Sequence, residues 1–559
     1  MTRVTRRVLS TLTAVVMVGT LFIGAPGPVR ATADHIYIGF NTHMGGGSCT
    51  DPDFTADGID DSAQIALAVA DTNVNGTLHF CPGTYDIDTT IDLSGTDITL
   101  QGAAAATTTL DGGGAVRILY SSGAITVSDL TFDDGYTAGD DGGAIRATTA
   151  TVTDSSFTNN TADDGGAINA STATVTDSTF TANTATQGGA IWAPTATVTG
   201  STFTGNDATD YGGAINADTT ATVSSSTFTN NTAAYSGGAI DAVTATVTDS
   251  TFTNNSAGYY GGAIYADTTA TVTDSTFTNN TAASSGGAIW ADITGTATVS
   301  NSTFTDNSAA VSGGAIRATT ATVSSSTFTN NTAANSGGAI RADDTATVSN
   351  STFTNNTALV GGAIRASTTA TVTDSTFTDN TADYDGGAIE TVTATVTGST
   401  FTDNTANYGG AIRATTATVT DSTFRTNSAD NGGAILASTT ATVTDSTFTG
   451  NTATADGGAI LANTGTIARS RFTRNTAGGH GGAVHLWAPN SDNLQQLRRN
   501  TFTRNQAGVG GAITLGSCGP AVSRSQVRSV ERGNRFSANR ATEQRRTNNI
   551  ESETGYCGD

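Results

Sequence analysis

The chain has 559 residues and a formal net charge of -24, and none of its basic residues is a lysine. A protein this acidic is repelled by nucleic acids and by anionic membrane surfaces, so we expect neither as a partner. The charge is uneven, because residues 463–559 contain 13 arginines against 6 acidic residues, whereas the rest of the chain is strongly acidic.

The chain begins with the features of a secretory signal peptide, which we assign to residues 1–33. Arg3, Arg6 and Arg7 form a basic start, residues 8–23 are apolar, and the small residues that end the segment suit signal peptidase. No later segment is apolar enough to cross a membrane as a helix. We therefore predict a secreted, extracellular protein, either free or associated with the cell surface.

Residues 34–110 are predicted to form an N-terminal cap and the first coils of a larger array. Apolar side chains recur at helical spacing in residues 60–70, and strand-like sequence follows up to Gly102. We expect a short helix that covers the open end of the first coil, because an exposed sheet end invites aggregation.

From residue 111 to residue 515 the chain repeats one unit. Its Gly-Gly-Ala-Ile or Gly-Gly-Ala-Val head occurs sixteen times, from Gly142 to Gly510, and successive heads start 23 to 29 residues apart. A second signature, Phe-x-x-Asn, also occurs sixteen times. A fixed period of this size is typical of a stacked array of like units. Residues 516–559 lose the pattern and are predicted to form a C-terminal cap and tail.

The composition of the unit indicates strands. In the copy at residues 337–360, Thr, Val, Ile, Phe and Ala dominate and there is no helical periodicity. Val348 and Phe353 should both point inward but have opposite parity, so a turn residue, Asn350, must lie between them. Further bends are expected near Asn355 and at the glycine pair. Three short strands and three bends describe one coil of a parallel β-helix.

Like residues should lie above one another when such coils stack at roughly 4.8 Å. Phe353 should then stack on Phe328 and Phe377 within aromatic contact range. Asn356 should line up with Asn331 in a ladder of side-chain amides that satisfies polar groups at a buried bend. We therefore predict one elongated, all-β domain that is monomeric.

The four cysteines lie outside the array, two in the N-terminal cap and two behind the last glycine pair. Four cysteines allow three pairings. Because the two ends of a long array are far apart, we predict the disulfides Cys49–Cys81 and Cys518–Cys557, which form in an oxidising compartment.

The combination of Gly-Gly-Ala-Ile and Phe-x-x-Asn resembles the polymorphic outer-membrane-protein repeat of bacterial surface adhesins, over roughly residues 130–540. Residues 60–102 resemble the N-terminal cap of pectin-lyase-like β-helices. The resemblance implies a right-handed parallel β-helix and an adhesin or another surface protein. Adhesins of this kind continue into a membrane-anchoring domain, which we do not recognise here, so we expect free secretion or wall association.

The position after Gly-Gly-Ala-Ile points outward and varies from copy to copy, as a binding face on a fixed scaffold would. Aromatic rings at Trp192, Tyr265 and Trp290 would stack on sugar rings. Arginines that would meet anionic groups occupy three further copies, namely Arg317, Arg341 and Arg365. The expected partner is a host-surface or polysaccharide ligand. The competing interpretation is an exposed position under no constraint.

Repeated β-helices also serve as polysaccharide lyases and glycoside hydrolases, which gives an alternative function. Gly479-His480-Gly481 resembles the Gly-His-Gly element of polygalacturonases, but the accompanying Arg-x-Lys is impossible in a chain without lysine. Adjacent acids, which would bind Ca²⁺ only weakly, occur in bends at Asp140-Asp141, Asp163-Asp164 and Asp343-Asp344. We predict no catalytic residue, no metal-ligand residue and no cofactor, and favour a non-enzymatic function.

A second outward column is more regular. Thr-Val-Thr or Thr-Val-Ser recurs fourteen times at one place in the unit, with the valine inward and both hydroxyl residues outward. A stacked Thr-x-Thr surface resembles the ice-binding face of β-helical antifreeze proteins, which gives a second alternative function. The competing interpretation is that threonine simply favours exposed strand positions.

Overall fold

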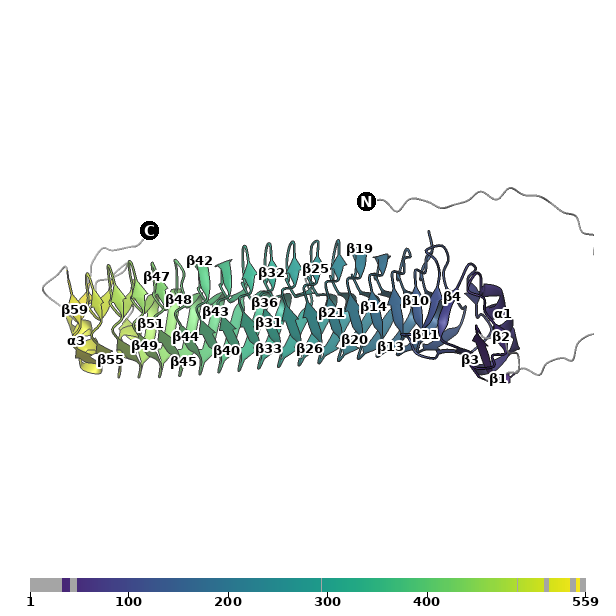
Figure 1. Ribbon diagram of the computed structural model, residues 1–559. Helices are drawn as coiled ribbons and strands as arrows, with labels where there is room; N and C mark the ends of the chain where they lie inside the picture. The colour runs from purple at the N-terminus through teal and green to yellow at the C-terminus, as the bar shows by residue number, and fades with distance from the viewer. Residues whose placement is uncertain are drawn as a thin grey trace, which may run out of the picture.

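The computed structural model describes residues 33–40, 48–292, 294–489, 491–516, 522–542 and 549–552. These residues form a parallel β-solenoid of about 17 turns with only 5% helix, which confirms the predicted right-handed parallel β-helix. Figure 1 shows the coils stacked into one long rod with helices at both ends. The predicted signal peptide, apart from Ala33, lies outside the described residues, and so do Cys518 and Cys557.

A coil from the middle of the rod shows how the repeat folds. It contains three strands, β36 (Ile340–Ser349), β37 (Thr352–Thr354) and β38 (Thr357–Val360). Asn350 and Asn355 form the two corners between these strands, with φ of 49° and 54°. Asparagine and aspartate tolerate this left-handed conformation better than other residues with a side chain, which explains their prevalence at both corners.

Equivalent strands of successive coils pair in parallel and form three ladders along the rod. The ladder of longest strands is a sheet of 27 strands, and the third ladder is divided into sheets of nine and five strands. The first ladder, the 27-stranded sheet, runs from β1 (Ala33–Gly39) to β60 (Ile550–Ser552). The second runs from β4 (Gly83–Asp86) to β58 (Arg535–Ser537). The third runs from β15 (Thr184–Gln187) to β59 (Arg540–Ala541).

The phenylalanine and asparagine ladders expected from the sequence are present. Phe353 stacks between Phe328 and Phe377, with ring centroids 4.8 Å apart on both sides and planes within 3°. Asn356 donates to Oδ1 of Asn380 at 2.9 Å and to the carbonyl oxygen of Phe328 at 3.0 Å. Register is therefore fixed by apolar stacking and by amide hydrogen bonds at the same time.

A buried serine ladder, which was not expected from the sequence, lies at the first corner of the coils from Ser155 to Ser470. The Ser351 hydroxyl accepts a hydrogen bond from the backbone N–H of Ser326 at 3.1 Å and donates to the carbonyl of Ser349 at 2.7 Å. The serine thus satisfies backbone groups that the corner would otherwise leave buried without a partner.

The two residues of each glycine pair are required for different reasons. Gly337 has φ of 63°, a left-handed conformation that glycine adopts without strain. At Gly338 a Cβ atom would lie 2.1 Å from the carbonyl oxygen of Gly362 in the next coil. The first glycine therefore bends the chain, and the second allows the coils to approach.

A helix and a disulfide close the N-terminal end as expected. Helix α1 (Ser62–Asp71) contacts β1 and β3 (Thr72–Phe80) and buries Ile65 and Val69. Cys49 and Cys81 form the predicted disulfide, with Cα atoms 5.3 Å apart.

Two further helices, α2 (Ser491–Gln496) and α3 (Arg524–Gly533), contact each other at the C-terminal end. Val530 of α3 is fully buried there, so this helix covers apolar surface. Within the described part of the chain, no helix combines the length and the apolar character that crossing a membrane requires.

Candidate functional site

The tight turn at each glycine pair brings three outward-facing columns of side chains together. The first column holds the residue before the glycine pair, the second holds the residue after Gly-Gly-Ala-Ile, and the third holds the residue two positions further on. In one coil these are Ser236, Asp241 and Val243, and the Ser236 hydroxyl donates to the Asp241 carboxyl group. We call these three columns together the corner strip.

The strands of the 27-stranded sheet position the corner strip, because its second column is the second residue of each long strand. First-column residues stack as well, since Tyr211, Ser236 and Tyr260 are linked by parallel bridges from coil to coil. The strands that carry the strip discussed below, besides β36, are β20 (Ile215–Ser224), β23 (Ile240–Thr248), β26 (Ile264–Thr273), β29 (Ile289–Ala291), β33 (Ile316–Ser324), β39 (Ile364–Ala366), β43 (Ile389–Thr397) and β54 (Val484–Leu486).

The corner strip is hollowed into a groove of about 450 Å³ in the N-terminal half of the rod. Tyr211 and Tyr235 meet edge to face in its wall, with ring centroids 5.3 Å apart. Three tyrosines and three carboxylic acids from consecutive coils line the groove: Tyr211, Tyr235, Tyr265, Asp218, Asp241 and Asp267. Aromatic faces and hydrogen-bonding groups thus surround one elongated hollow.

The groove contains a carboxyl group that keeps its proton at neutral pH. Burial raises the pKa of Asp241 to about 8, and the hydrogen bond from Ser236 only partly offsets this effect. Burial also raises the pKa of Asp218, and burial together with nearby acids raises the pKa of the Tyr265 phenol. The lining therefore offers O–H donors as well as oxygen acceptors.

Trp290, which we expected on the exposed face, is only 5% exposed. The ring of Tyr260 covers it with centroids 4.1 Å apart, and the guanidinium of Arg317 lies 4.3 Å from its ring centroid. Its Nε1 donates to Asp292 at 3.3 Å. The first column of the neighbouring coil thus shields this ring, whereas Trp192 remains partly exposed.

The three arginines of the predicted ligand face are brought together, but each has an acidic partner. Arg317 and Arg341 share Asp343, at N–O distances of 3.2 and 2.9 Å. Arg365 contacts the buried carboxylate of Glu390 at 2.5 Å. Burial raises the pKa of Glu390, although the arginines around it oppose that shift. This section of the strip therefore presents less positive charge than the sequence suggests.

The adjacent acids proposed for weak Ca²⁺ binding are partly neutralised as well. Asp140 contacts Arg117 at 2.6 Å and also pairs with Arg146. Asp164 has no such partner among the ion pairs of the described residues, and burial and neighbouring acids, Asp163 among them, raise its pKa to about 6. At Asp140 and Asp141 the arginines thus supply the positive charge that a cation would otherwise provide.

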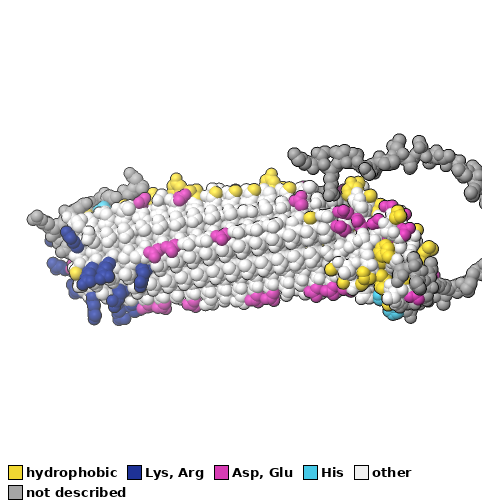
Figure 2. All heavy atoms as spheres, viewed as in Figure 1, with side chains coloured by type: hydrophobic (Ala, Val, Ile, Leu, Met, Phe, Trp, Pro, Cys, Tyr) yellow, Lys and Arg dark blue, Asp and Glu magenta, His cyan; other side chains and the backbone are white. Residues whose placement is uncertain are grey.

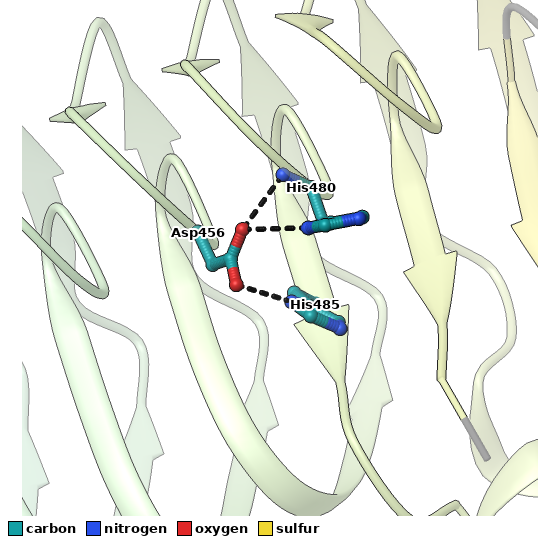
Figure 3. A group of neighbouring side chains, drawn as sticks. All are labelled: Asp456, His480 and His485. Atoms are coloured by element: carbon teal, nitrogen blue, oxygen red, sulfur yellow. Dashed lines mark hydrogen bonds and ion pairs between the residues drawn. The ribbon is translucent and has the colours of Figure 1, made fainter. Parts of the chain in front are cut away.

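A second cluster lies on the corner strip near the C-terminal end and is drawn in Figure 3. Asp456 and His480 occupy the first column of consecutive coils, and His485 occupies the second column. Nδ1 of His480 is 2.9 Å from Oδ1 of Asp456, and Nδ1 of His485 is 3.5 Å from Oδ2. Burial acts to raise the pKa of Asp456, but hydrogen bonds from both histidines outweigh it and hold the pKa well below its usual range.

Arginine side chains gather at the C-terminal end of the rod, where Figure 2 shows them in dark blue on the visible face. Arg469 takes the corner position that aspartate holds in other coils, with φ of 54°, and makes two bonds to Asp445 at 2.7 and 2.5 Å. The exposed arginines of this end include Arg469, Arg471, Arg474, Arg498, Arg499, Arg504 and Arg535.

The family described as "Right handed beta helix region" matches residues 114–277 and 262–424, which together make up more than half of the chain. The chain belongs to this β-helix family. The Chlamydia polymorphic membrane protein repeat matches residues 445–463 of the β-helix, in agreement with the repeat signature. No curated protein matches the chain.

Several solved structures resemble the β-helix at low sequence identity. An alginate lyase of the PL6 family is 10% identical with a TM-score of 0.30, over 86% of this chain and 99% of that one. PfbA, a surface adhesin of Streptococcus pneumoniae, is 14% identical with a TM-score of 0.24, over 67% and 90%. An α-1,3-glucanase from Streptomyces thermodiastaticus is 14% identical with a TM-score of 0.23, over 89% and 68%. Similarity this low carries no argument about function.

The ligand face expected from the sequence is the second column of the strip, whereas the first column entered the sequence-based expectations only as bend residues such as Asp141, Asp164 and His480. Tyr211 and Asp456 directly precede glycine pairs and Tyr235 lies two residues before one, in a segment that the sequence indicated only as a bend. The available signal was a spacing of five, which separates Ser236 from Asp241 across one glycine turn. Residues five apart across such a turn lie side by side on the surface.

Proposed function

We propose that this β-helix is a secreted or cell-surface binding protein that holds a polysaccharide along its corner strip. The groove carries the proposal, because tyrosines and carboxyl groups converge there from consecutive coils. Tyrosine faces pack against the apolar faces of sugar rings, and carboxyl groups exchange hydrogen bonds with sugar hydroxyls. A rod with one continuous strip suits an extended ligand better than a compact one.

The charge of the groove favours a neutral polysaccharide over a polyanion. Asp218 and Asp267 line the groove together with Asp241, whereas no arginine does. Carboxylates repel anionic sugars when no cation compensates them. We therefore expect neutral hexose polymers to bind more tightly than uronic-acid polymers of the same length.

The test is a glycan-binding assay with the full-length protein and variants of the groove. Replacing Tyr235, which is 41% exposed, and Tyr265 by alanine should weaken binding about tenfold or more, because aromatic side chains dominate such contacts. Tyr384→Ala is the matched control, since this tyrosine is 54% exposed and does not line the groove. Equal binding by the groove variant and the control would refute the proposal.

A polysaccharide hydrolase is the second candidate, and the protonated Asp241 is the observation that favours it. A carboxylic acid with a pKa of about 8 can protonate a leaving oxygen at neutral pH, and Asp218 and Asp267 share its groove. Release of reducing ends by the wild type, lost in Asp241→Asn while glycan binding persists, is the expected result for an enzyme. Binding without any release favours the non-enzymatic function.

Ice binding by the outward threonines of the Thr-Val-Thr column is a further alternative function, on a different face from the groove. Val372 is buried, and Thr371 pairs in register with Thr347 and Thr395 of the adjoining coils. Measured thermal hysteresis that disappears on replacement of Thr371 by leucine supports this alternative. If the wild type shows no thermal hysteresis, ice binding is ruled out.

A further inference from the structure

Asp456, His480 and His485 lie together because two neighbouring coils present them at the same corner. Asp456 belongs to one coil, and both histidines belong to the next, on either side of its glycine pair. Figure 3 shows the two imidazole rings on the same side of the carboxylate, with a ring nitrogen of each directed at it. One potential ligand atom from each residue lies within 4.8 Å of the other two.

The two contacts between the histidines and the carboxylate are close in length to ligand–ligand distances in a metal centre. Zinc binds imidazole nitrogen and carboxylate oxygen at about 2.0 to 2.2 Å, so tetrahedral ligand atoms are separated by about 3.3 Å. Nδ1 of His485 and Oδ2 of Asp456 are 3.5 Å apart. The 2.9 Å separation between His480 and Asp456 is shorter and needs to open by only about 0.4 Å to accommodate an ion between them.

The site is built into the protein and not spread over its surface. His485 is fully buried, and the side chains of Asp456 and His480 are only 10% and 18% exposed. The backbone N–H of His480 donates to Asp456 at 2.8 Å and holds the carboxylate in place. At Gly479 a Cβ atom would lie 2.6 Å from Oδ1 of Asp456, so only glycine leaves room for this carboxylate position.

We propose that Asp456, His480 and His485 bind a divalent transition-metal cation such as Zn²⁺, Co²⁺ or Ni²⁺. Two imidazoles and one carboxylate suit these borderline ions, whereas Ca²⁺ prefers six to eight oxygen ligands. The bound ion would join two adjacent coils near the C-terminal end of the rod. His480, the most exposed of the three side chains, marks the side on which a further ligand would complete the coordination. This site is independent of the proposed polysaccharide groove.

The test uses full-length, metal-free protein titrated with Zn²⁺ or Co²⁺ by calorimetry, with Ca²⁺ as the comparison ion. We expect one tightly bound ion at the site, a Co²⁺ visible absorption spectrum typical of low coordination number, and a higher unfolding temperature with metal. His480→Gln and Asp456→Asn should each weaken Zn²⁺ binding at least about tenfold, because each removes one of three protein ligands.

The N-terminal cap provides the matched control. His35 and His79 also lie close together, with Nδ1 of His35 3.1 Å from Nε2 of His79. The double variant His35→Gln/His79→Gln should therefore keep the assigned site intact. The proposal is overturned if the wild type binds no transition metal, or if binding survives His480→Gln and Asp456→Asn and vanishes in the cap variant. Circular dichroism of each variant separates loss of the ligand from loss of the fold.

Discussion

A buried polar side chain in this β-helix is bonded mainly to the coils on either side of its own. Asn356 illustrates this, because its Nδ2 donates to Asn380 and to the carbonyl of Phe328, while its Oδ1 accepts from Asn331. The backbone N–H of Asn331 also donates to that Oδ1. Loss of one amide thus leaves several groups of neighbouring coils without a partner, which is why the position is so uniform.

The first prediction concerns this ladder. Asn356→Ala should lower the free energy of unfolding by about 1–3 kcal/mol for each buried group left unsatisfied. Amide hydrogen exchange should accelerate at Asn331, which loses the acceptor for its N–H. Thr352→Ala, in the same coil but with an exposed side chain, should change stability by less than about 0.5 kcal/mol. Equal effects of the two variants would contradict the ladder's role.

The second prediction concerns Asp241 and pH. Its pKa is about 8 in the folded protein and is ordinarily 3.8, so the folded state holds a proton that the unfolded chain releases. The free energy of unfolding contributed by this group therefore falls as pH rises from about 4 to 8. Asp241→Asn removes that dependence, so the unfolding temperature of the variant relative to wild type should increase over this range. Thermal scans between pH 5 and pH 8 test it, and a constant difference would speak against a protonated Asp241.

At the scale of the strand and the turn, the glycine pair determines both the fold and the site. Gly338 lies so close to Gly362 of the next coil that a Cβ has no room. The turn at Gly337, which precedes it, places the first column beside the second. A change at this turn is therefore expected to disturb the stacking of coils and the corner strip together.

The third prediction separates steric contact from backbone strain at such turns. Gly338→Ala should destabilise the protein by about 1–3 kcal/mol or more, because the added methyl group overpacks the contact between coils. Gly205→Ala is the control, since Gly205 has φ of 62° but open space around its Cβ position. That variant should show only the cost of a left-handed alanine, about 1 kcal/mol. Chemical unfolding measures the stability of both variants. A larger loss of stability in Gly205→Ala than in Gly338→Ala would contradict the role of steric contact at Gly338.

The elements of the fold were predictable because the period itself encodes them. The turn at Asn350 follows from the opposite parity of Val348 and Phe353, and the structure gives the expected left-handed φ. The site was less predictable, because several of its contacts join residues of neighbouring coils that are 24 to 30 positions apart. His485 and Asp456 belong to different coils, and the shielding of Trp290 by Tyr260 depends on side-chain packing that no local pattern shows.

The whole molecule is a polar rod, acidic over most of its length and basic toward its C-terminal end. Figure 2 shows acidic side chains scattered along the visible face and arginines concentrated at one end. The regular coils between the caps depend on their neighbours for stability, so the ends are where unfolding should begin. The N-terminal cap adds a covalent constraint to its helix through Cys49 and Cys81.

The fourth prediction concerns this cap. Cys49→Ser/Cys81→Ser should lower the stability of the cap by about 2–4 kcal/mol, because the disulfide closes a loop with a sequence separation of 32. Faster hydrogen exchange should appear in α1 and β3 and should leave the coil at β36 unchanged. A greater tendency to aggregate is also expected, since an uncovered sheet end pairs with other chains. Acceleration spread evenly along the rod would indicate that the cap and the coils unfold as one unit.

The in-register ladders have a consequence for how this protein can change over generations. Excising the segment between two equivalent asparagines, such as Asn331 and Asn356, would bring Asn307 and Asn356 together with the same bonds that each makes now. Recombination between near-identical stretches of the gene could therefore shorten or lengthen the rod by whole coils. Each such event would bring different side chains together on the corner strip, so the architecture allows new ligand preferences to arise without a new fold.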